Sequence, residues 1–347
     1  MHIPGWLRIR TASRLTKDIL RGGSVKAIRV HEIGGPEVLK LETVADPVPA
    51  AGQVLVRLHA VGVNPVETYI RAGQYAKLPS PPYTPGNDGA GVVEAIGDGV
   101  TRVAVGERVY IGGSLTGSYA EKTLAEEARV HPMPDHFSFS EGAGMGVPHT
   151  TAYHALYQRG AAQPAETVLV HGATGGVGIA AVQLARAGGM TVIATGGSEE
   201  GRALLRELGA DHVLDHRAEG HMDEALKLTD GRGVDVILEM LADVNLGIDL
   251  PALARGGRVV VIGNRGNVEI NARNLMQRRA SVHGAAQALV TPAEYRNAHA
   301  ALGACIRDGT VRPVIARELP LERAPEAHEL VLEPGARGKI VLLPGAD

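Results

Sequence analysis

A glycine-rich segment near the middle of the chain has the residue types and spacing of a phosphate-binding turn. It follows the apolar run 167–171 and consists, in order, of Gly172, Ala173, Thr174, Gly175, Gly176, Val177 and Gly178. Against the dinucleotide pattern G-x-G-x-x-G, Ala173 stands at the first glycine position, and Gly175 and Gly178 stand at the other two. Glycine allows close backbone approach to a pyrophosphate, and the start of the following helix offers free N–H groups. The alternative is a purely structural turn, but the flanking strand and helix patterns favour dinucleotide binding.

The end of the next predicted strand bears on which dinucleotide is bound. It consists of Thr195-Gly196-Gly197-Ser198, without the Asp or Glu that an NAD site places there for the ribose 2′-hydroxyl. Glu199 and Glu200 follow at the expected start of a helix, where acidic side chains stabilise the helix dipole without a cofactor role. The small residues leave room for a 2′-phosphate, with Arg202, His216 and Arg265 as candidate charge partners. We therefore expect NADPH to be preferred over NADH.

Two sequence patterns describe the elements that must position these segments. Residues 26–134 form short apolar runs between Gly- and Pro-rich turns, which predicts a β-rich, barrel-like unit. From about Thr150 near-continuously apolar strands alternate with amphipathic helices, which is typical of a doubly wound α/β domain with a parallel sheet. The strands expected in this second unit are 167–171, 191–195, 212–215, 234–238 and 258–263. A helix over 291–307 follows, and tail strands near Val314 and at 339–343 are expected to rejoin the first unit.

The composition excludes several classes of function. The 347 residues carry 35 Lys and Arg against 38 Asp and Glu, and this net charge of −3 argues against nucleic acid as a partner. The single cysteine, Cys305, can build neither an intramolecular disulfide nor a four-cysteine zinc site. No run approaches the ~18 apolar residues of a transmembrane helix, so we expect no membrane association. The expectation is a cytoplasmic protein of about two domains.

Residues 1–24 differ from the rest of the chain because they are rich in Arg and nearly free of acidic residues. They lack the apolar centre of a secretory signal. The interpretation we favour is an extension outside the folded unit, or a start codon placed too early. An organellar presequence is the alternative. The folded part is expected to begin with a strand at 25–30.

A β-rich unit followed by a dinucleotide-binding unit resembles the medium-chain dehydrogenase/reductase superfamily, from residue 25 onward. Zinc alcohol dehydrogenases of that superfamily carry the segments G-x-C-x-x-[DH] and G-H-E-x-x-G. The corresponding segments here are 62–67 and 86–91, in which Asn64 replaces the ligand cysteine and Asn87 replaces the ligand histidine. The resemblance therefore implies a member without the usual zinc sites, which lacks the Lewis acid that alcohol oxidation requires.

Longer segments resemble one zinc-free branch of the superfamily, the zeta-crystallin family of NADPH:quinone oxidoreductases. They are 34–39, 62–71, 83–88, 171–178, 237–242 and 245–246. This resemblance implies a GroES-like catalytic domain formed by residues 25–150 and 312–347, and a Rossmann-type NADP-binding domain formed by 151–311. It also implies a homodimer or homotetramer, with edge strands near 258–262 and 280–284 as the contact.

The resemblance also implies which residues contact NADP. They are Tyr69, the loop 174–177, Gly197, His216, Asn245 and the turn Ile262-Gly263-Asn264-Arg265, with Ser198 beside Gly197 in the same site. Some bacterial relatives have a Lys just after the second strand for the 2′-phosphate, whereas this chain has Gly201 and Arg202 there. Either Arg202 takes the place of that Lys, or His216 and Arg265 carry the contact alone.

The reaction left to a zinc-free member is hydride transfer to a small acceptor in a cleft between the two domains. An electron-poor quinone or a conjugated enone accepts reducing equivalents without a Lewis acid. Our hypothesis gives Asn64 and Tyr69 hydrogen bonds to the substrate carbonyl oxygen, where negative charge develops. The alternatives are an ordinary turn residue for Asn64 and a packed aromatic for Tyr69. The sequence leaves open whether water or Tyr69 delivers the proton, and whether one or two electrons are transferred.

Two further functions stay open at this point. The first is an NADPH-dependent enone or alkenal double-bond reductase with the same cofactor site. The second is a non-enzymatic role, either structural or RNA-binding, as in crystallin-like relatives. The intact glycine segment disfavours a purely structural role, and the net charge disfavours RNA binding.

Overall fold

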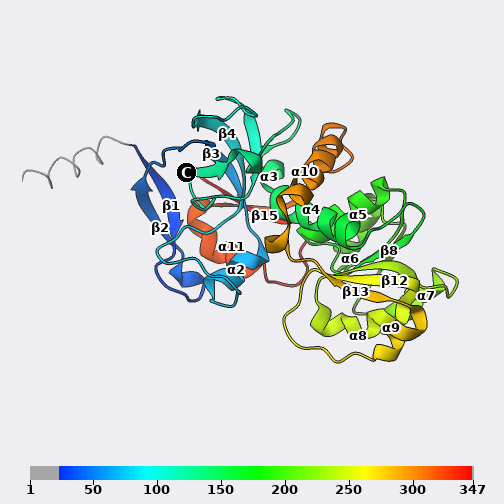
Figure 1. Cartoon of the computed structure of the whole chain (residues 1–347). Helices are drawn as coiled ribbons and strands as arrows, with labels where there is room; N and C mark the ends of the chain where they lie inside the picture. The colour runs from blue at the N-terminus through cyan, green and yellow to red at the C-terminus, as the bar shows by residue number, and fades with distance from the viewer. Residues whose placement is uncertain (1–22, 346–347) are drawn as a thin grey trace, which may run out of the picture.

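The computed structural model describes residues 23–345 of the chain, and Figure 1 shows how their elements are arranged. Most of the predicted extension, residues 1–24, lies outside these described residues. The first strand, β1 (Ser24–Arg29), pairs antiparallel with β2 (Lys40–Ala45). Within residues 23–345, no helix is long and apolar enough to cross a membrane.

The N-terminal half forms a seven-stranded sheet in the order β14-β15-β3-β4-β5-β7, with β6 also paired to β3. Its strands are β3 (Gln53–Gly62), β4 (Asp88–Ile96), β5 (Arg108–Gly112), β6 (Lys122–Glu126), β7 (Val130–Pro132), β14 (Ile315–Pro320) and β15 (Lys339–Leu343). Along β3, Val56 and Leu58 are buried while Arg57 between them is exposed. This period-two alternation is why the segment forms a strand with one face in the core.

Short helices close the edges of this sheet. They are α2 (Pro65–Arg71), α3 (Phe139–Ala143) and α11 (Ala324–Leu330), with single 3₁₀ turns η1 (Pro36–Val38), η2 (Glu127–Arg129) and η5 (Leu321–Arg323). Helix α2 begins at Asn64, whose backbone is extended, and Pro65 occupies its first position, where the missing N–H is not needed. Asn64 and Glu67 form a reciprocal capping box at this helix start.

The second half forms a six-stranded parallel sheet in the order β10-β9-β8-β11-β12-β13. The strands are β8 (Thr167–Val170), β9 (Thr191–Thr195), β10 (His212–Leu214), β11 (Val234–Glu239), β12 (Leu253–Val261) and β13 (Ser281–Gly284). The helices between them are α5 (Gly176–Ala187), α6 (Glu199–Glu207), α7 (His221–Lys227), α8 (Ala242–Ala252) and α9 (Ala272–Arg278), and the 3₁₀ turn η4 (Gln287–Leu289) follows β13. The predicted doubly wound α/β domain is confirmed.

Both faces of this parallel sheet are covered. Val168 and Val170 of β8 pack into a core with residues of α5, while Leu169 between them packs into a second core with residues of α8. All three side chains are 0% exposed. Because neither face meets water, the strand contains no polar alternation, which explains its continuously apolar sequence.

Helices connect the two halves, and the tail returns to the first. Helix α4 (Gly146–Tyr153) continues into the π-helical segment η3 (His154–Arg159), and α10 (Pro292–Arg307) lies beside α4 (Figure 1). Strand β15 then pairs antiparallel with β3, with Val341 opposite Gly62 and Leu342 opposite Val61. Residues 339–343 therefore complete the first sheet, as the sequence predicted.

One expectation about sheet edges is wrong. Residues 258–262 were expected to form an edge strand, but β12 lies between β11 and β13 and pairs in parallel with both. Only β13, which contains most of 280–284, ends the sheet on that side. The two segments differ in sequence: β12 contains a Val-Val-Val run in which Val259 and Val260 are buried, as an inner strand requires, whereas β13 is Ser-Val-His-Gly and largely exposed.

Candidate functional site

The glycine turn joins β8 to α5 and leaves the start of that helix open. Gly175 is the N-cap of α5 and has an extended backbone. A Cβ on Gly178 would lie 2.5 Å from the Cα of Ala173, so only glycine lets the helix pack this close to the turn. The first N–H groups of α5 have no intrahelical acceptors, and together with the helix dipole they form an anion site. The predicted contacts Ala173, Thr174, Gly175, Gly176, Val177 and Gly178 all lie here.

The tip of β9 lies beside two basic side chains. A Cβ on Gly197 would lie 2.9 Å from His216 Nε2 and 3.0 Å from Arg217 Nε, so these groups flank the glycine closely. Ser198 caps α6, and its side chain accepts a hydrogen bond of 3.1 Å from Gly201 N. The predicted Ser198 contact to the cofactor therefore competes with this capping role.

Arg202, a predicted partner of the 2′-phosphate, is already engaged. Its guanidinium pairs with Asp215 at 2.7 Å and with Glu199 at 2.8 Å, and donates to Gly196 O at 3.1 Å. Arg217, which the sequence did not single out, makes no side-chain hydrogen bond or ion pair with any residue of the range 23–345. Arg217 is thus the better placed of the two to receive an external anion.

The remaining predicted cofactor contacts lie at the ends of β11 and β12. Asn245 on α8 donates from Nδ2 to Glu239 Oε1 at 3.1 Å. In the turn 262–265, a Cβ on Gly263 would lie 2.2 Å from Met240 O, so this turn packs directly against the end of β11. Arg265 is exposed, and its backbone N–H donates to Asp243 Oδ1 at 2.8 Å. The structure thus places four segments at the carboxyl ends of the parallel strands, where ligands bind in such folds. They are the glycine turn, Gly197, Asn245 and the turn 262–265.

A buried polar network occupies the position of the lost zinc ligands. Asn64 donates from Nδ2 to Asp88 Oδ2 at 2.9 Å and to Glu67 Oε1 at 3.2 Å. Its Oδ1 accepts a hydrogen bond from Lys339 Nζ, which also lies 3.5 Å from Asp88 Oδ2. Asn64, Glu67, Asp88 and Lys339 are all buried. We call these four residues the Lys339 network.

This geometry does not favour the substrate contact expected for Asn64, which stays a prediction. Both amide protons of Asn64 are donated to buried carboxylates, so none is left for a substrate carbonyl oxygen. Tyr69, the other predicted catalytic residue, lies one turn further along α2 and is partly exposed, and its hydroxyl has no hydrogen-bond partner among residues 23–345. Tyr69 therefore remains able to donate to a substrate, whereas Asn64 positions its neighbours.

The single cation of the Lys339 network compensates part of the charge of its two buried carboxylates. Burial raises the pKa of Glu67 and of Asp88, and the Lys339 ammonium opposes both shifts. Burial lowers the pKa of Lys339, and Asp88 and Glu67 oppose that shift. Glu67 also accepts from Asn64 N at 2.8 Å and from the Tyr119 hydroxyl at 2.7 Å. Every carboxylate in the network therefore receives hydrogen bonds or a cation.

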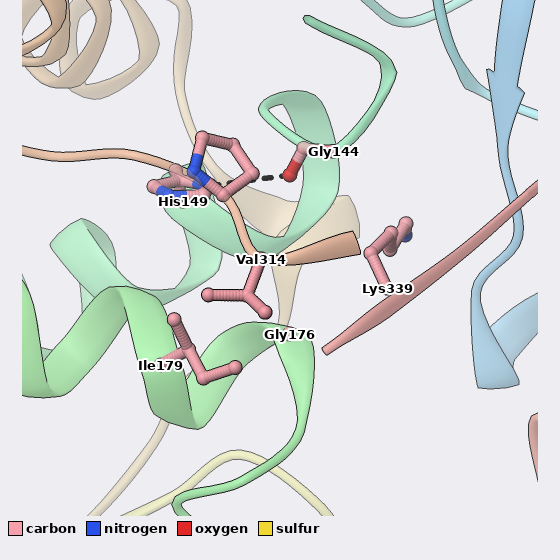
Figure 2. A pocket seen from close by; sticks show the side chains of 7 residues that line it. Gly144, His149, Gly176, Ile179, Val314 and Lys339 are labelled. Carbon is pink, nitrogen blue, oxygen red and sulfur yellow. Dashed lines mark hydrogen bonds between the residues drawn. The ribbon is translucent and has the colours of Figure 1, made fainter. Parts of the chain in front are cut away.

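The Lys339 network is tied to the glycine turn. Gly338 N donates to Thr174 O at 2.9 Å, immediately before Lys339 begins β15. Figure 2 shows the small pocket that results, in which Lys339 lies with Gly176 at the start of α5, Ile179 and Val314. Across the pocket, His149 Nδ1 lies 3.2 Å from Gly144 O. The buried cation and the phosphate-binding turn are thus parts of one site.

Sequence reasoning missed Lys339 and Arg217. Lys339 stands in a strand pattern, where a lysine is normally exposed, and 275 positions separate it from Asn64. A usable signal was the pair of acids that follow the two lost ligand positions, Glu67 and Asp88, since buried acids need a cation. Arg217 follows His216 directly, so its nearness to Gly197 could have been inferred from the residue beside it.

The site and fold define a class of protein, and comparisons with known proteins support it. Residues 50–135 match the family described as "Alcohol dehydrogenase GroES-like domain", and residues 176–303 match the family described as "Zinc-binding dehydrogenase". A solved NAD-dependent alcohol dehydrogenase has a TM-score of 0.86 at 30% identity, covering 92% of this chain and 100% of that chain. The protein is a two-domain oxidoreductase of the medium-chain dehydrogenase/reductase superfamily.

Sequence relatives specify the family. The chain is 46% identical to human quinone oxidoreductase over 321 residues, which cover 92% of this chain and 98% of the relative. It is 47% identical to the mouse quinone oxidoreductase over 324 residues, with the same coverage. The Escherichia coli quinone oxidoreductase solved with NADPH has a TM-score of 0.83 at 30% identity, over 92% of this chain and 100% of that chain. The chain belongs to the quinone oxidoreductase (zeta-crystallin) family, which confirms the resemblance.

Proposed function

We propose that this protein is a zinc-independent NADPH:quinone oxidoreductase. The observation that carries the proposal is the Lys339 network, in which an amide and an ammonium replace metal ligands next to a dinucleotide-binding turn. Asn64 and Asn87 are poor zinc ligands, and Lys339 supplies the positive charge that Asp88 and Glu67 require. A quinone suits such a site because it accepts hydride without a Lewis acid.

The chain's own residues bind, orient and enclose the reactants. The first turn of α5 and the basic residues at Gly197 bind the phosphates of the dinucleotide. NADPH, when bound, supplies the hydride. The Tyr69 hydroxyl donates a hydrogen bond to the substrate carbonyl oxygen. The one proton that completes the hydroquinone after hydride transfer comes from water, or from this hydroxyl, which water then reprotonates. Asn64 and Lys339 hold α2 and β15 so that Tyr69 keeps its place.

The test is NADPH oxidation against 1,2-naphthoquinone, benzoquinone and 2-alkenals, with metal analysis of the same sample. Quinone turnover without stoichiometric zinc supports the proposal. Faster turnover of 2-alkenals than of every quinone would favour the double-bond reductase instead. Zinc at one ion per chain, with activity lost on chelation, would contradict zinc independence.

The preference for NADPH is assigned to Arg217 together with His216. We expect Arg217→Ala to weaken NADPH binding by about ten-fold, typical of losing one charge-assisted phosphate contact, and to leave NADH binding unchanged. Arg202→Ala is the matched comparison, and its effect on NADPH binding should be smaller because Arg202 is paired with Asp215 and Glu199. A larger loss of NADPH binding in Arg202→Ala than in Arg217→Ala would reverse the assignment.

We also propose that β13 forms the contact of a homo-oligomer. β13 ends the parallel sheet, so one side of it has unpaired backbone groups. Exposed apolar side chains lie on and near it, with Val282 38%, Met276 78% and Leu289 81% exposed. Light scattering of the wild type should give a dimer or tetramer, and Val282→Lys should shift it toward the monomer. A monomeric wild type would contradict this contact.

A further inference from the structure

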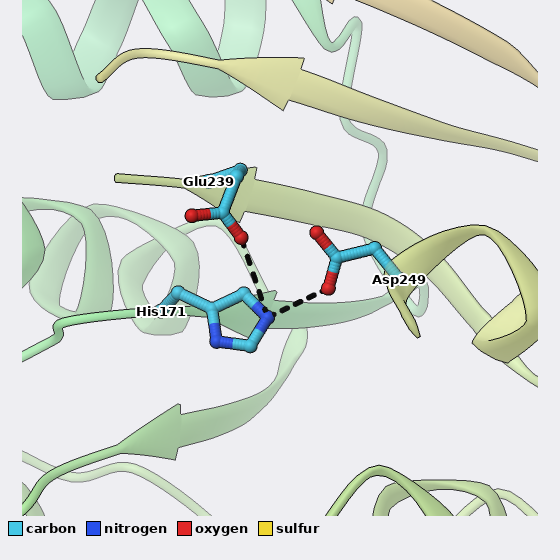
Figure 3. Close-up of side chains that lie close together, drawn as sticks. All are labelled: His171, Glu239 and Asp249. Carbon is cyan, nitrogen blue, oxygen red and sulfur yellow. Dashed lines mark hydrogen bonds and ion pairs between the residues drawn. The ribbon is translucent and has the colours of Figure 1, made fainter. Parts of the chain in front are cut away.

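Three titratable side chains converge where the parallel strands end beside the glycine turn (Figure 3). His171 directly follows β8, Glu239 ends β11 and Asp249 lies on α8. One ring nitrogen of His171 and one carboxylate oxygen of each acid all lie within 4.8 Å of one another. His171 is 2% exposed, and Glu239 and Asp249 are 0% exposed. Unlike the Lys339 network, this cluster contains no lysine or arginine.

The hydrogen bonds of the cluster leave two buried oxygens unexplained. His171 Nε2 lies 2.8 Å from Asp249 Oδ1 and 3.6 Å from Glu239 Oε2. Glu239 Oε1 accepts from Leu241 N and from Asn245 Nδ2. Glu239 Oε2 and Asp249 Oδ2 are buried and have no hydrogen-bond partner among the described residues. Two ionised carboxylates could not stay in this place without a compensating charge.

We propose that Glu239 is a positioning residue for the dinucleotide, and that it acts in its protonated form, donating from Oε2 to Asp249 Oδ2. A single proton in this place satisfies both unpartnered oxygens. It leaves Asp249 as the one ionised acid, with the His171 Nε2–H as its second donor. The inference rests on the proposed cofactor site, because its consequence is the placement of residues that we expect to contact NADPH.

Glu239 connects three segments of that cofactor site. Its side chain holds Asn245 at 3.1 Å. Its backbone oxygen accepts from Ile262 N at 2.8 Å and from Gly263 N at 3.2 Å, at the start of the turn 262–265. Its neighbour Leu238 accepts from His171 N at 3.0 Å, one residue before the glycine turn. Repulsion between Glu239 and Asp249 would therefore disturb all three segments together.

The surroundings agree with a shared proton. Burial, opposed by His171 and reinforced by the Asp249 carboxylate, raises the pKa of Glu239 to about 7. Burial also raises the pKa of Asp249 to about 7 and lowers the pKa of His171. The other titratable groups facing the cluster are His221 at the start of α7, whose ring lies 6.4 Å from that of His171, and His216 in the preceding loop.

The test compares NADPH dissociation constants at pH 6.5 and pH 8.5 by fluorescence titration, for wild type, Glu239→Gln and the exposed control Glu219→Gln. Wild type and control should bind about ten-fold more weakly at pH 8.5, because the competent protonated form is depleted. Glu239→Gln mimics the protonated acid and should lose this pH dependence. An equal pH dependence in wild type and Glu239→Gln would overturn the proposal, as would one divalent metal ion per chain in the purified protein.

Infrared spectroscopy supplies a readout that needs no cofactor. Wild type should show the C=O band of a protonated carboxyl group at pH 6.5, lost at pH 8.5 and missing from Glu239→Gln. If Glu239→Gln does not fold, Asp249→Asn supplies the test. Without the neighbouring negative charge Glu239 loses its proton more readily, so the band should disappear at a lower pH than in wild type. Loss of the band at the same pH as in wild type counts against the proposal. Absence of NADPH binding in every form contradicts the proposed function instead, while the band still decides the protonation of Glu239.

Discussion

The two halves of this protein bury carboxylates in different ways. In the Lys339 network, Asp88 and Glu67 are compensated by an ammonium group and by amide, hydroxyl and backbone donors. The cluster of His171, Glu239 and Asp249 contains no lysine or arginine, and two of its oxygens have no donor within the described part of the chain. The Lys339 network compensates its carboxylates with an ammonium group of the chain, whereas the cluster depends on a shared proton. The comparison teaches that charge compensation in the catalytic half depends on one side chain, Lys339, and that compensation in the nucleotide half depends on a proton and therefore on pH near 7.

The largest expected effect comes from removing the fixed cation. Lys339→Met leaves two buried carboxylates uncompensated, so the free energy of unfolding should fall by about 3–5 kcal/mol. Lys227→Met is the matched control, because Lys227 is 73% exposed and, among residues 23–345, pairs only with Glu224. It should change stability by less than about 0.5 kcal/mol. Urea unfolding followed by circular dichroism measures both. Equal stability of Lys339→Met and wild type would break the comparison.

A second substitution should recover part of that loss. In Lys339→Met/Asp88→Asn, the acid closest to the missing ammonium is neutral, so we expect the double variant to be about 1–3 kcal/mol more stable than Lys339→Met alone. The same urea titrations measure this difference. Asp88→Asn alone completes the double-mutant cycle with wild type, Lys339→Met and the double variant. If the two substitutions were simply additive, Asp88 and Lys339 would not be energetically coupled.

The proton-sharing cluster should instead show itself in the pH dependence of stability. The pKa of Glu239 is raised to about 7 in the folded state and is about 4.3 when unfolded. Its contribution is therefore fully present below pH ~4.3 and is lost as the pH rises toward 7, by at most about 1.4 kcal/mol per pH unit. In Glu239→Gln the part of the decline that comes from Glu239 should vanish.

The buried histidines require that this pH effect be measured as a difference. Burial lowers the pKa of His131 to about 3 and of His299 to about 2, so these groups remove stability as the pH falls below ~6.5. Because both proteins contain them, the difference between wild type and Glu239→Gln isolates Glu239. A pH-independent difference between the two would show that Glu239 does not titrate in this range.

The smallest expected effect on stability is that of Tyr69→Phe, which is best compared with Tyr119→Phe in the same half. Tyr119→Phe removes a hydroxyl that lies 2.7 Å from Glu67 and 3.0 Å from His328, and should cost about 1–3 kcal/mol. Tyr69→Phe removes a hydroxyl without a partner in residues 23–345, and should cost less than about 0.5 kcal/mol while lowering quinone turnover. Unfolding and steady-state assays of both variants test this. Unchanged turnover in Tyr69→Phe would remove its proposed catalytic role.

Much of the fold in both halves followed from sequence pattern. The strand 191–195 and the tail strand 339–343 were predicted with the bounds that the structure shows. The glycine turn was found because its function depends on neighbours in sequence, where a Cβ on Gly178 would lie 2.5 Å from Ala173 Cα. The contacts of Asn64 could not be predicted for the opposite reason. Its partners Asp88 and Lys339 come from distant strands, and no local spacing shows that they meet.

The sequence by itself determined the order of strands and helices, the phosphate-binding turn and the loss of the zinc ligands. These follow from periodicity and from residue types a few positions apart, which act through the backbone of one segment. Only the tertiary structure decided that Lys339 meets Asn64, that Arg217 rather than Arg202 is left without an ion pair among the described residues, and that Glu239 faces Asp249. Such side-chain contacts depend on which strands become neighbours in a sheet. Charge compensation in a buried site is set there, because it acts over distance in space and not along the chain.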